Sequence, residues 1–396
     1  MTDFFSPLRS LKEGHWFKLI CGASFQHLPS IRTLALVYAL AGADCIDVAA
    51  DPAIVSTARE AIAIAAQLAP SSPWLMVSLN DGEDPHFRKA EFDAARCPAD
   101  CPRPCESICP ADAIVFKGAI AGVIDDRCYG CGRCVPICPI GQISTRSYVY
   151  TPEVISPLLL QSGIDAIEIH TQVGRFEDFR RLWQAISPWC HHLKLIAISC
   201  PDGDDLIEYL WSLHDLIAPL PCALIWQTDG RPMSGDIGDG ATRASVKLAQ
   251  KVLTAKLPGY IQLAGGTNRH TVPKLETLEL LHNRDSNFVS SARPRTDLCF
   301  KSSEHQRVSG IAYGSYARSL LAPVLAQLEA LEKPSLTRSW LTDEPPYAPP
   351  VRIESEPHLL GQAVDLARTL VGQIKSFDRC LQVIPYTPAF YQDPLT

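Results

Sequence analysis

The chain has 396 residues, enough for two or three average domains or for one large α/β domain with an insertion. A hydrophobic fraction of 46% and a charged fraction of 20% are typical of a globular protein, and the net charge of −7 argues against nucleic acid as a partner. The most apolar stretches, 34–43 and 220–226, are much shorter than the roughly 20 residues that span a bilayer, and the N-terminus lacks the apolar core of a signal peptide. We therefore expect a cytoplasmic protein without a transmembrane segment.

Short apolar runs alternate with helical patterns along most of the chain. The apolar runs predict strands at 17–23, 45–50, 74–80, 164–170, 192–199, 222–228, 260–266 and 307–314. The helical patterns lie at 30–41, 53–68, 153–162, 176–186, 204–217, 240–256, 272–282 and 316–332. Eight strands alternating with helices match a (β/α)₈ barrel, and an open doubly wound sheet is the alternative.

A cysteine-rich segment interrupts this alternation after the third strand. We expect residues 1–87 to form the first part of the barrel-like domain, 88–148 an inserted α+β module and 149–333 the rest of the barrel. Residues 334–396 are read as a Pro-rich C-terminal extension with one helix near 358–376. An insertion after a barrel strand lies among the loops of the C-terminal face, where the active sites of such barrels are built.

Eight of the fifteen cysteines lie between positions 97 and 138, in a chain without a secretory signal, which favours metal binding over disulfides. The second half of this block contains Cys128, Cys131, Cys134 and Cys138, followed by Pro139. This C-x₂-C-x₂-C-x₃-C-P spacing is typical of iron–sulfur clusters in bacterial ferredoxins. The segment therefore predicts a ferredoxin-like iron–sulfur module.

The first half of the block, Cys97, Cys101, Cys105 and Cys109, has three residues between successive cysteines. Its ending CPADAI, at 109–114, matches CPIGQI, at 138–143, which indicates an internal duplication. In duplicated modules the fourth cysteine of each run serves the other cluster. The predicted ligand sets are Cys128, Cys131, Cys134 and Cys109 for one cluster, and Cys97, Cys101, Cys105 and Cys138 for the other.

Two [4Fe–4S] clusters are the expected content of the module. The relaxed spacing of the first run leaves open whether its cluster has four irons or is a [3Fe–4S] cluster. A pair of zinc sites is the alternative, since CxxC spacings also bind tetrahedral zinc. The doubled C-x₃-C-P ending favours clusters, because cross-ligation by the fourth cysteines explains it.

The loops after the seventh and eighth strands carry the residues Gly265, Gly266, Gly314, Ser315 and Arg318. In many barrels these two loops bind a phosphate through backbone N–H groups, so a flavin or another phosphate-bearing ligand is one interpretation. A glycine pair that ends a strand is also simply a turn, and this alternative stays open.

Other polar residues give weaker indications. The loop at 228–243 offers Asp229, Arg231, Asp236 and Asp239, which suit a ligand site or a solvated loop equally well. His170 ends the fourth strand, where a histidine is more often hydrogen-bonded than catalytic, and we assign no catalytic residue. His191 and His192 precede a strand and are expected at the opposite end. Cys21, at the end of the first strand, is a candidate reactive thiol.

The runs FKLICGASFQHLPSIRTLALVYALAGADCIDVAAD and CPADCPRPCESICP, together with the double cluster module between two parts of a barrel, resemble the cyanobacterial light-dependent-period (LdpA) family over nearly the whole chain. The resemblance implies an iron–sulfur redox sensor that conveys light-dependent cellular redox state to the circadian clock and adjusts its period. It also implies the clock proteins KaiA and CikA as partners.

Two functions remain after these observations. The first is the non-enzymatic redox sensor that the resemblance implies. The second is an oxidoreductase in which a flavin or another phosphate-bearing ligand in the barrel mouth exchanges electrons with the clusters. The electron donor, or a quinone that is sensed, is not encoded in any spacing of the sequence.

Overall fold

A computed structural model of the chain describes residues 6–69, 72–116, 121–147, 163–230, 238–281, 307–331 and 351–375. Eight parallel strands close into a barrel in the order β1-β12-β11-β10-β9-β8-β3-β2. They are β1 (Trp16–Gly22), β2 (Cys45–Ala49), β3 (Trp74–Asn80), β8 (Ala166–His170), β9 (Leu195–Pro201), β10 (Ala223–Asp229), β11 (Tyr260–Ala264) and β12 (Gly310–Tyr313). The predicted (β/α)₈ barrel is confirmed, and the open sheet is excluded.

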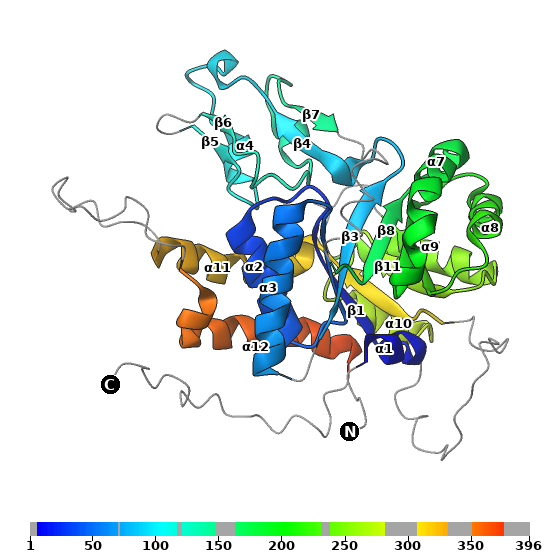
Figure 1. Cartoon of the computed structure of the whole chain (residues 1–396). Coiled ribbons are helices and arrows are strands. Elements are labelled where there is room, and N and C mark those ends of the chain that lie inside the picture. The colour runs from blue at the N-terminus through cyan, green and yellow to red at the C-terminus, as the bar shows by residue number, and fades with distance from the viewer. Residues whose placement is uncertain are drawn as a thin grey trace, which may run out of the picture.

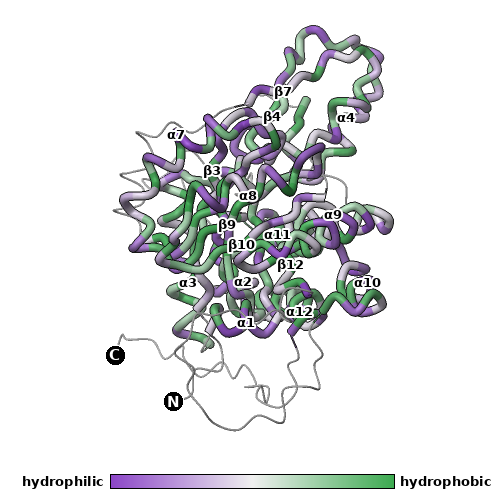
Figure 2. Tube along the Cα trace, turned by 90° about the vertical axis from the view of Figure 1, so that its right-hand side faces the viewer, coloured by the Kyte–Doolittle hydropathy of each residue, from purple (hydrophilic) through white to green (hydrophobic). Residues whose placement is uncertain are grey.

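The strands are apolar because both of their faces are covered. Every residue of β2, β3 and β8 is buried, since one face of a barrel strand meets the interior and the other meets the surrounding helices. In Figure 2 the strands in the middle of the molecule are mostly hydrophobic, whereas hydrophilic residues gather in the outer turns and in the protruding module.

Helices surround the barrel (Figure 1). They are α2 (Leu28–Leu40), α3 (Pro52–Leu68), α7 (Phe176–Ile186), α8 (Leu206–Ile217), α9 (Thr242–Thr254), α10 (Thr271–Thr277) and α11 (Ser315–Leu331). In α7 the buried residues Phe179, Leu182, Trp183 and Ile186 recur at helical spacing on one face. None of the helices in the described ranges is long and apolar enough to cross a membrane.

Two predicted elements are not confirmed with their predicted bounds. The strand expected at 192–199 begins only at Leu195, because Ser187–His192 forms a 3-10 helix (η3) with Pro188 in its first turn. This 3-10 helix leaves His191 and His192 exposed at the N-terminal end of β9, away from the barrel mouth, as predicted. The helix expected at 153–162 lies outside the described residues.

The N-terminal end of the barrel is closed by α1 (Pro7–Glu13). Leu11 of this helix packs with Trp16, Trp74 and Met76 in an apolar cluster at that end. The helix of the C-terminal segment, α12 (Pro357–Ile374), follows a 3-10 turn, η6 (Ile353–Ser355), and packs against α11 and α2. The described part of this segment therefore belongs to the outer layer of the barrel.

The cysteine-rich module leaves the barrel after β3 and protrudes from the end opposite α1 (Figure 1). After two 3-10 turns, η1 (Pro85–Phe87) and η2 (Ala94–Arg96), its helices are α4 (Pro104–Ser107) and α5 (Cys134–Ile137). Its strands form two antiparallel pairs, β4 (Arg88–Glu91) with β7 (Ser144–Ser147) and β5 (Ile114–Val115) with β6 (Gly122–Val123). Because α4 and α5 contain Cys105 and Cys134 at equivalent positions of the duplicated sequence, the structure repeats the duplication.

Candidate functional site

Four cysteines from both halves of the module surround one hollow of about 420 Å³. They are Cys109, Cys128, Cys131 and Cys134. Cys109 belongs to the first run in sequence, yet it lies with the three cysteines of the second run. This grouping is the one that cross-ligation by the fourth cysteine requires.

Cysteines of the other predicted set also lie near one another. Gln142 donates a backbone hydrogen bond to Sγ of Cys138 (3.4 Å) and a side-chain hydrogen bond to Sγ of Cys97 (3.3 Å). Burial raises the pKa of Cys105, and the neighbouring Cys138 and Cys97 add to this effect. The structure therefore brings Cys97, Cys105 and Cys138 together, and Cys101 lies four residues before Cys105 in the sequence.

Backbone hydrogen bonds to the sulfurs repeat between the two halves. The N–H of Ala113 donates to Sγ of Cys109 at 3.3 Å, and the N–H of Gln142 donates to Sγ of Cys138 at 3.4 Å. Both bonds join a fourth cysteine to the residue four positions later. Such bonds stabilise the negative charge of a thiolate bound to a cluster and tune its reduction potential.

The spacing of the sulfurs bears on the zinc alternative. A tetrahedral zinc ion, with Zn–S bonds of about 2.3 Å, holds its four sulfurs about 3.8 Å apart. The described residues contain no group of three cysteine sulfurs within 4.8 Å of one another. A cubane spreads its ligands farther, because each thiolate binds a different iron, so the donor set fits an iron–sulfur cluster better than zinc.

Gly130, within the second run, is required by a close backbone contact. It has φ +69°, and a Cβ atom at this position would lie 2.3 Å from the carbonyl oxygen of Arg88 in β4. Only glycine combines this left-handed conformation with such an approach. The loop that carries Cys128 and Cys131 is thereby held against the first strand of the module.

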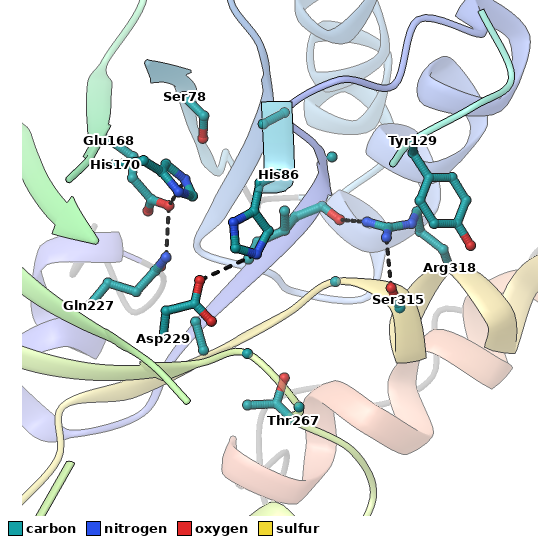
Figure 3. A pocket seen from close by; sticks show the side chains of 17 residues that line it. Ser78, His86, Tyr129, Glu168, His170, Gln227, Asp229, Thr267, Ser315 and Arg318 are labelled. Carbon is teal, nitrogen blue, oxygen red and sulfur yellow. Dashed lines mark hydrogen bonds and ion pairs between the residues drawn. The ribbon is translucent and has the colours of Figure 1, made fainter. Parts of the chain in front are cut away.

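A second hollow of about 640 Å³ opens at the barrel mouth, beneath the module (Figure 3). All five residues predicted as ligand contacts line it, namely Gly265, Gly266, Gly314, Ser315 and Arg318. Gly265 and Gly266 both have positive φ, +66° and +87°, which makes this segment a tight turn as well. The structure brings the predicted residues together, while their role in binding stays a prediction.

Arg318 is held by the barrel itself. One terminal nitrogen donates to the carbonyl oxygens of Ile20 (2.8 Å) and Cys21 (3.1 Å), and the other donates to Oγ of Ser315 (2.9 Å). The guanidinium also lies 4.2 Å from the ring centre of Tyr129, a cation–π contact. Arg318 therefore joins the barrel mouth to the cluster module, a role that the sequence did not indicate.

Tyr129 lies between the two hollows. It is the residue after Cys128, and it lines both the hollow of the four cysteines and the hollow of the barrel mouth. Phe25 of the barrel packs edge-on against its ring at 5.7 Å. The side chain of Tyr129 is thus a direct contact between a cluster loop and the barrel cavity.

Below the mouth, the barrel interior contains a buried ionic layer. Lys18 of β1, fully buried, contacts the carboxylate of Glu168 in β8 and lies 3.5 Å from Asp47 in β2. Burial would lower the pKa of Lys18, but the two carboxylates outweigh it and raise the pKa. Burial likewise opposes ionisation of Glu168, but Lys18 and His170 outweigh it and lower its pKa to about 2. Lys18 and Glu168 therefore form a charged pair.

Glutamine side chains extend this layer across the barrel. Gln227 donates to Glu168 at 2.7 Å and to Ser199 at 3.0 Å. Gln262 donates to Gln227 at 2.5 Å and accepts from the indole N–H of Trp16 at 2.5 Å. Polar side chains of five strands, β1, β8, β9, β10 and β11, are connected in this way.

Other predicted residues have mixed outcomes. Asp229 and His170 line the barrel hollow, whereas Asp239 is exposed and contacts His270 at 3.1 Å. Arg231 and Asp236 lie outside the described residues. The expectation for Cys21 was wrong, because burial raises the pKa of this thiol to about 12 and leaves it protonated at neutral pH.

Most of the polar residues inside the barrel were not predicted from the sequence. Lys18 stands in FKLIC, Asp47 in CIDVA, Glu168 in AIEIH and Gln262 in YIQLA, each a polar residue in the middle of an apolar strand. A buried parallel strand rarely tolerates such a residue without a partner, so this recurrence was the available signal. Asp84 and His86 lie in the loop before the module, and their proximity to His170 had no signal in the sequence.

Comparisons with known proteins show matches to two family domains and to a full-length relative. Residues 97–149 match the LdpA Fe-S cluster-binding domain, and residues 158–373 match the Light dependent period A C-terminal domain. The chain is 50% identical over 370 residues to Light dependent period A of Synechococcus elongatus, covering 93% of this chain and 94% of that protein. An uncharacterized ferredoxin of Methanocaldococcus jannaschii is 48% identical over 46 residues, covering 12% of this chain and 30% of the ferredoxin.

Among solved structures, wild-type GGGPS from Thermoplasma volcanium covers 94% of this chain and 97% of its own at 10% identity, with a TM-score of 0.39, too low to support a conclusion. The identity to the Synechococcus protein and the matches to both domains cover nearly the whole chain. An iron–sulfur cofactor follows from the matched cluster-binding domain. The chain belongs to the Light dependent period A family.

Proposed function

We propose that this chain is an iron–sulfur redox sensor that conveys light-dependent cellular redox state to the circadian clock, through KaiA and CikA, and so modulates the clock period. The observation that carries the proposal is the position of Tyr129, which lines both the hollow of four cysteines and the barrel cavity. A change in cluster charge acts first on this side chain and on the Arg318 guanidinium stacked over it.

The proposed cofactors are two clusters with the cross-ligated cysteine sets. The set of Cys109, Cys128, Cys131 and Cys134 holds a [4Fe–4S] cluster, and the set of Cys97, Cys101, Cys105 and Cys138 holds a [4Fe–4S] or a [3Fe–4S] cluster. The repeated N–H bonds to Cys109 and Cys138 support this assignment. Analysis of iron and acid-labile sulfide tests it, because two cubanes give about eight irons per chain and one three-iron cluster gives about seven.

Partner binding tests the sensor itself. We expect immobilised KaiA or CikA to bind anaerobically purified protein with different affinities after dithionite and after a mild oxidant. In Tyr129→Leu the cluster content should stay unchanged while this difference shrinks, because the contact between module and barrel is lost. Tyr129→Phe is the matched control, since it keeps the ring that packs against Phe25 and Arg318. Equal binding of oxidised and reduced wild-type protein would contradict the proposal.

A second candidate function is an iron–sulfur oxidoreductase with a flavin or another phosphate-bearing ligand in the barrel mouth. The hollow at the barrel mouth, with the Gly265–Gly266 turn at its edge, favours it, since the loops after the last two strands of such barrels commonly bind a phosphate. A flavin peak above the broad iron–sulfur absorption, and release of flavin on denaturation, would support this function. Protein free of flavin with redox-dependent partner binding would favour the sensor.

A further inference from the structure

Three potential metal ligands converge in the barrel mouth, apart from the cysteines. Oδ1 of Asp84 lies 2.8 Å from Nδ1 of His86 and 3.8 Å from Nδ1 of His170. The three ligand atoms lie within 4.8 Å of one another. Nitrogen and oxygen ligands at about 2.0–2.2 Å from a metal ion are themselves about 3.0–3.5 Å apart, so the observed spacing brackets that of a coordinated ion.

The two imidazoles are oriented by carboxylates on their other side. Nε2 of His86 lies 3.3 Å from Asp229 of β10, and Nε2 of His170 lies 2.9 Å from Glu168 of β8. Figure 3 shows both rings beside these acidic residues at the edge of the hollow. Histidines that bind metals typically donate this second N–H to a carboxylate, which fixes the tautomer and directs the lone pair of the other nitrogen at the ion. Here both remaining nitrogens are directed at Asp84.

The buried carboxylates around Asp84, His86 and His170 favour binding of a cation. Buried carboxylates connected to this group are Asp47, Glu168 and Asp229, and Asp84 itself is mostly buried, whereas Lys18 is the ammonium that faces them. In addition, Oδ1 of Asp229 is buried without a hydrogen-bond partner. When both imidazoles are neutral, as metal ligands are, the four carboxylates and one ammonium leave an excess of negative charge, and a divalent ion offsets most of it.

We propose that Asp84, His86 and His170 form a mononuclear site for a divalent first-row transition-metal ion, separate from the iron–sulfur clusters. Two imidazoles and one carboxylate suit iron(II), cobalt(II) or zinc, whereas magnesium and calcium prefer oxygen ligands. His86 and His170 both line the hollow at the barrel mouth, so the site lies at the edge of this hollow. The site goes beyond the proposed sensor function and does not depend on it.

The bound ion can be measured without interference from cluster iron by using cobalt(II) as the probe. Anaerobic full-length protein with intact clusters is dialysed against cobalt(II), and bound cobalt is counted by elemental mass spectrometry. We expect about one cobalt per chain in the wild type and in His191→Ala, an exposed histidine far from the mouth. His86→Ala should weaken binding at least about tenfold, and Asp229→Asn, which removes only the orienting carboxylate, by about 10–100-fold.

Two results would overturn the site: a wild type that binds no cobalt, which would mean that protons bridge the three groups, or binding that is equal in wild type, His86→Ala and Asp229→Asn. Iron, sulfide and visible absorbance are recorded on the same samples. A variant that loses cobalt but keeps its clusters supports the site whatever the outcome for the sensor. Absence of clusters from protein that binds cobalt would count against the sensor proposal alone.

Discussion

The Lys18–Glu168 pair in the barrel interior makes a sharp prediction about stability. Both side chains are at most 1% exposed, and the ammonium contacts the Glu168 carboxylate directly. Replacing one member by a neutral residue of similar size leaves the other charge buried and short of a partner. Losses of this kind cost about 3–5 kcal/mol. We therefore expect Lys18→Met and Glu168→Gln each to lower the free energy of unfolding by about that amount.

The double variant separates this cause from a general packing defect. With both charges of this pair removed, neither leaves the other without its partner, so the loss in Lys18→Met/Glu168→Gln should be smaller than the sum of the single losses by at least about 2 kcal/mol. Asp47, 3.5 Å from Lys18, keeps part of its cost in the double variant, because it then lacks the ammonium. Full recovery of wild-type stability is therefore not expected.

Urea unfolding followed by far-UV circular dichroism, under anaerobic conditions, measures these differences. A loss of 3 kcal/mol moves the midpoint by about 1 M when the slope is about 3 kcal/mol per M. Lys251→Met is the control, because its ion pair with Asp202 is exposed and such pairs contribute about 0–1 kcal/mol. Single losses below about 1 kcal/mol, or losses that simply add, would refute the reasoning.

Three further predictions concern cysteines and the module. Cys109→Ser should weaken the EPR signal of the second-run cluster, and loss confined to the first-run signal would disprove cross-ligation. Gly130→Ala should lower iron and sulfide content, because its Cβ would lie 2.3 Å from the Arg88 carbonyl oxygen, whereas Gly141→Ala, also at positive φ but with open space, should keep both clusters. Cys21 should resist iodoacetamide in native protein at pH 8, since its pKa is raised to about 12, and rapid labelling detected by peptide mass spectrometry would contradict that burial.

The barrel could be predicted from the sequence because its strands are mostly apolar and alternate regularly with helical patterns. The same property hid the interior: when both faces of a strand are buried, the alternation that marks an inward side chain disappears. Lys18 and Glu168 are 150 positions apart, and only closure of the barrel places them in contact. The cluster ligands, in contrast, could be predicted from the duplicated cysteine spacing, because most ligands of one cluster lie close together in the sequence.

The contact between module and barrel could not be predicted from the spacing of the cysteines. Tyr129 stands between two cysteines in a motif defined by the cysteines alone, and Arg318 was predicted only as a contact for a phosphate-bearing ligand. The structure stacks one on the other and ties the guanidinium to barrel carbonyls. Such a contact depends on how the insertion folds back over the mouth, which neither segment specifies alone.

The path of the chain gives the two proposed clusters different surroundings. The module is inserted between β3 and β8, which pair with each other, so the insertion leaves and re-enters the barrel at neighbouring strands. The cluster of the second run lies next to Tyr129 and the barrel cavity, and two of its four cysteines, Cys128 and Cys134, are buried. In the other set only Cys105 is buried, and Ile140, two residues after Cys138, is 49% exposed. In the proposed function, an external donor or oxidant therefore meets the outer cluster first, and the inner cluster passes the change to Tyr129. Substitutions around the outer cluster should then alter how fast the protein responds to an oxidant or reductant. Substitutions at Tyr129 should alter how strongly partner binding depends on the redox state.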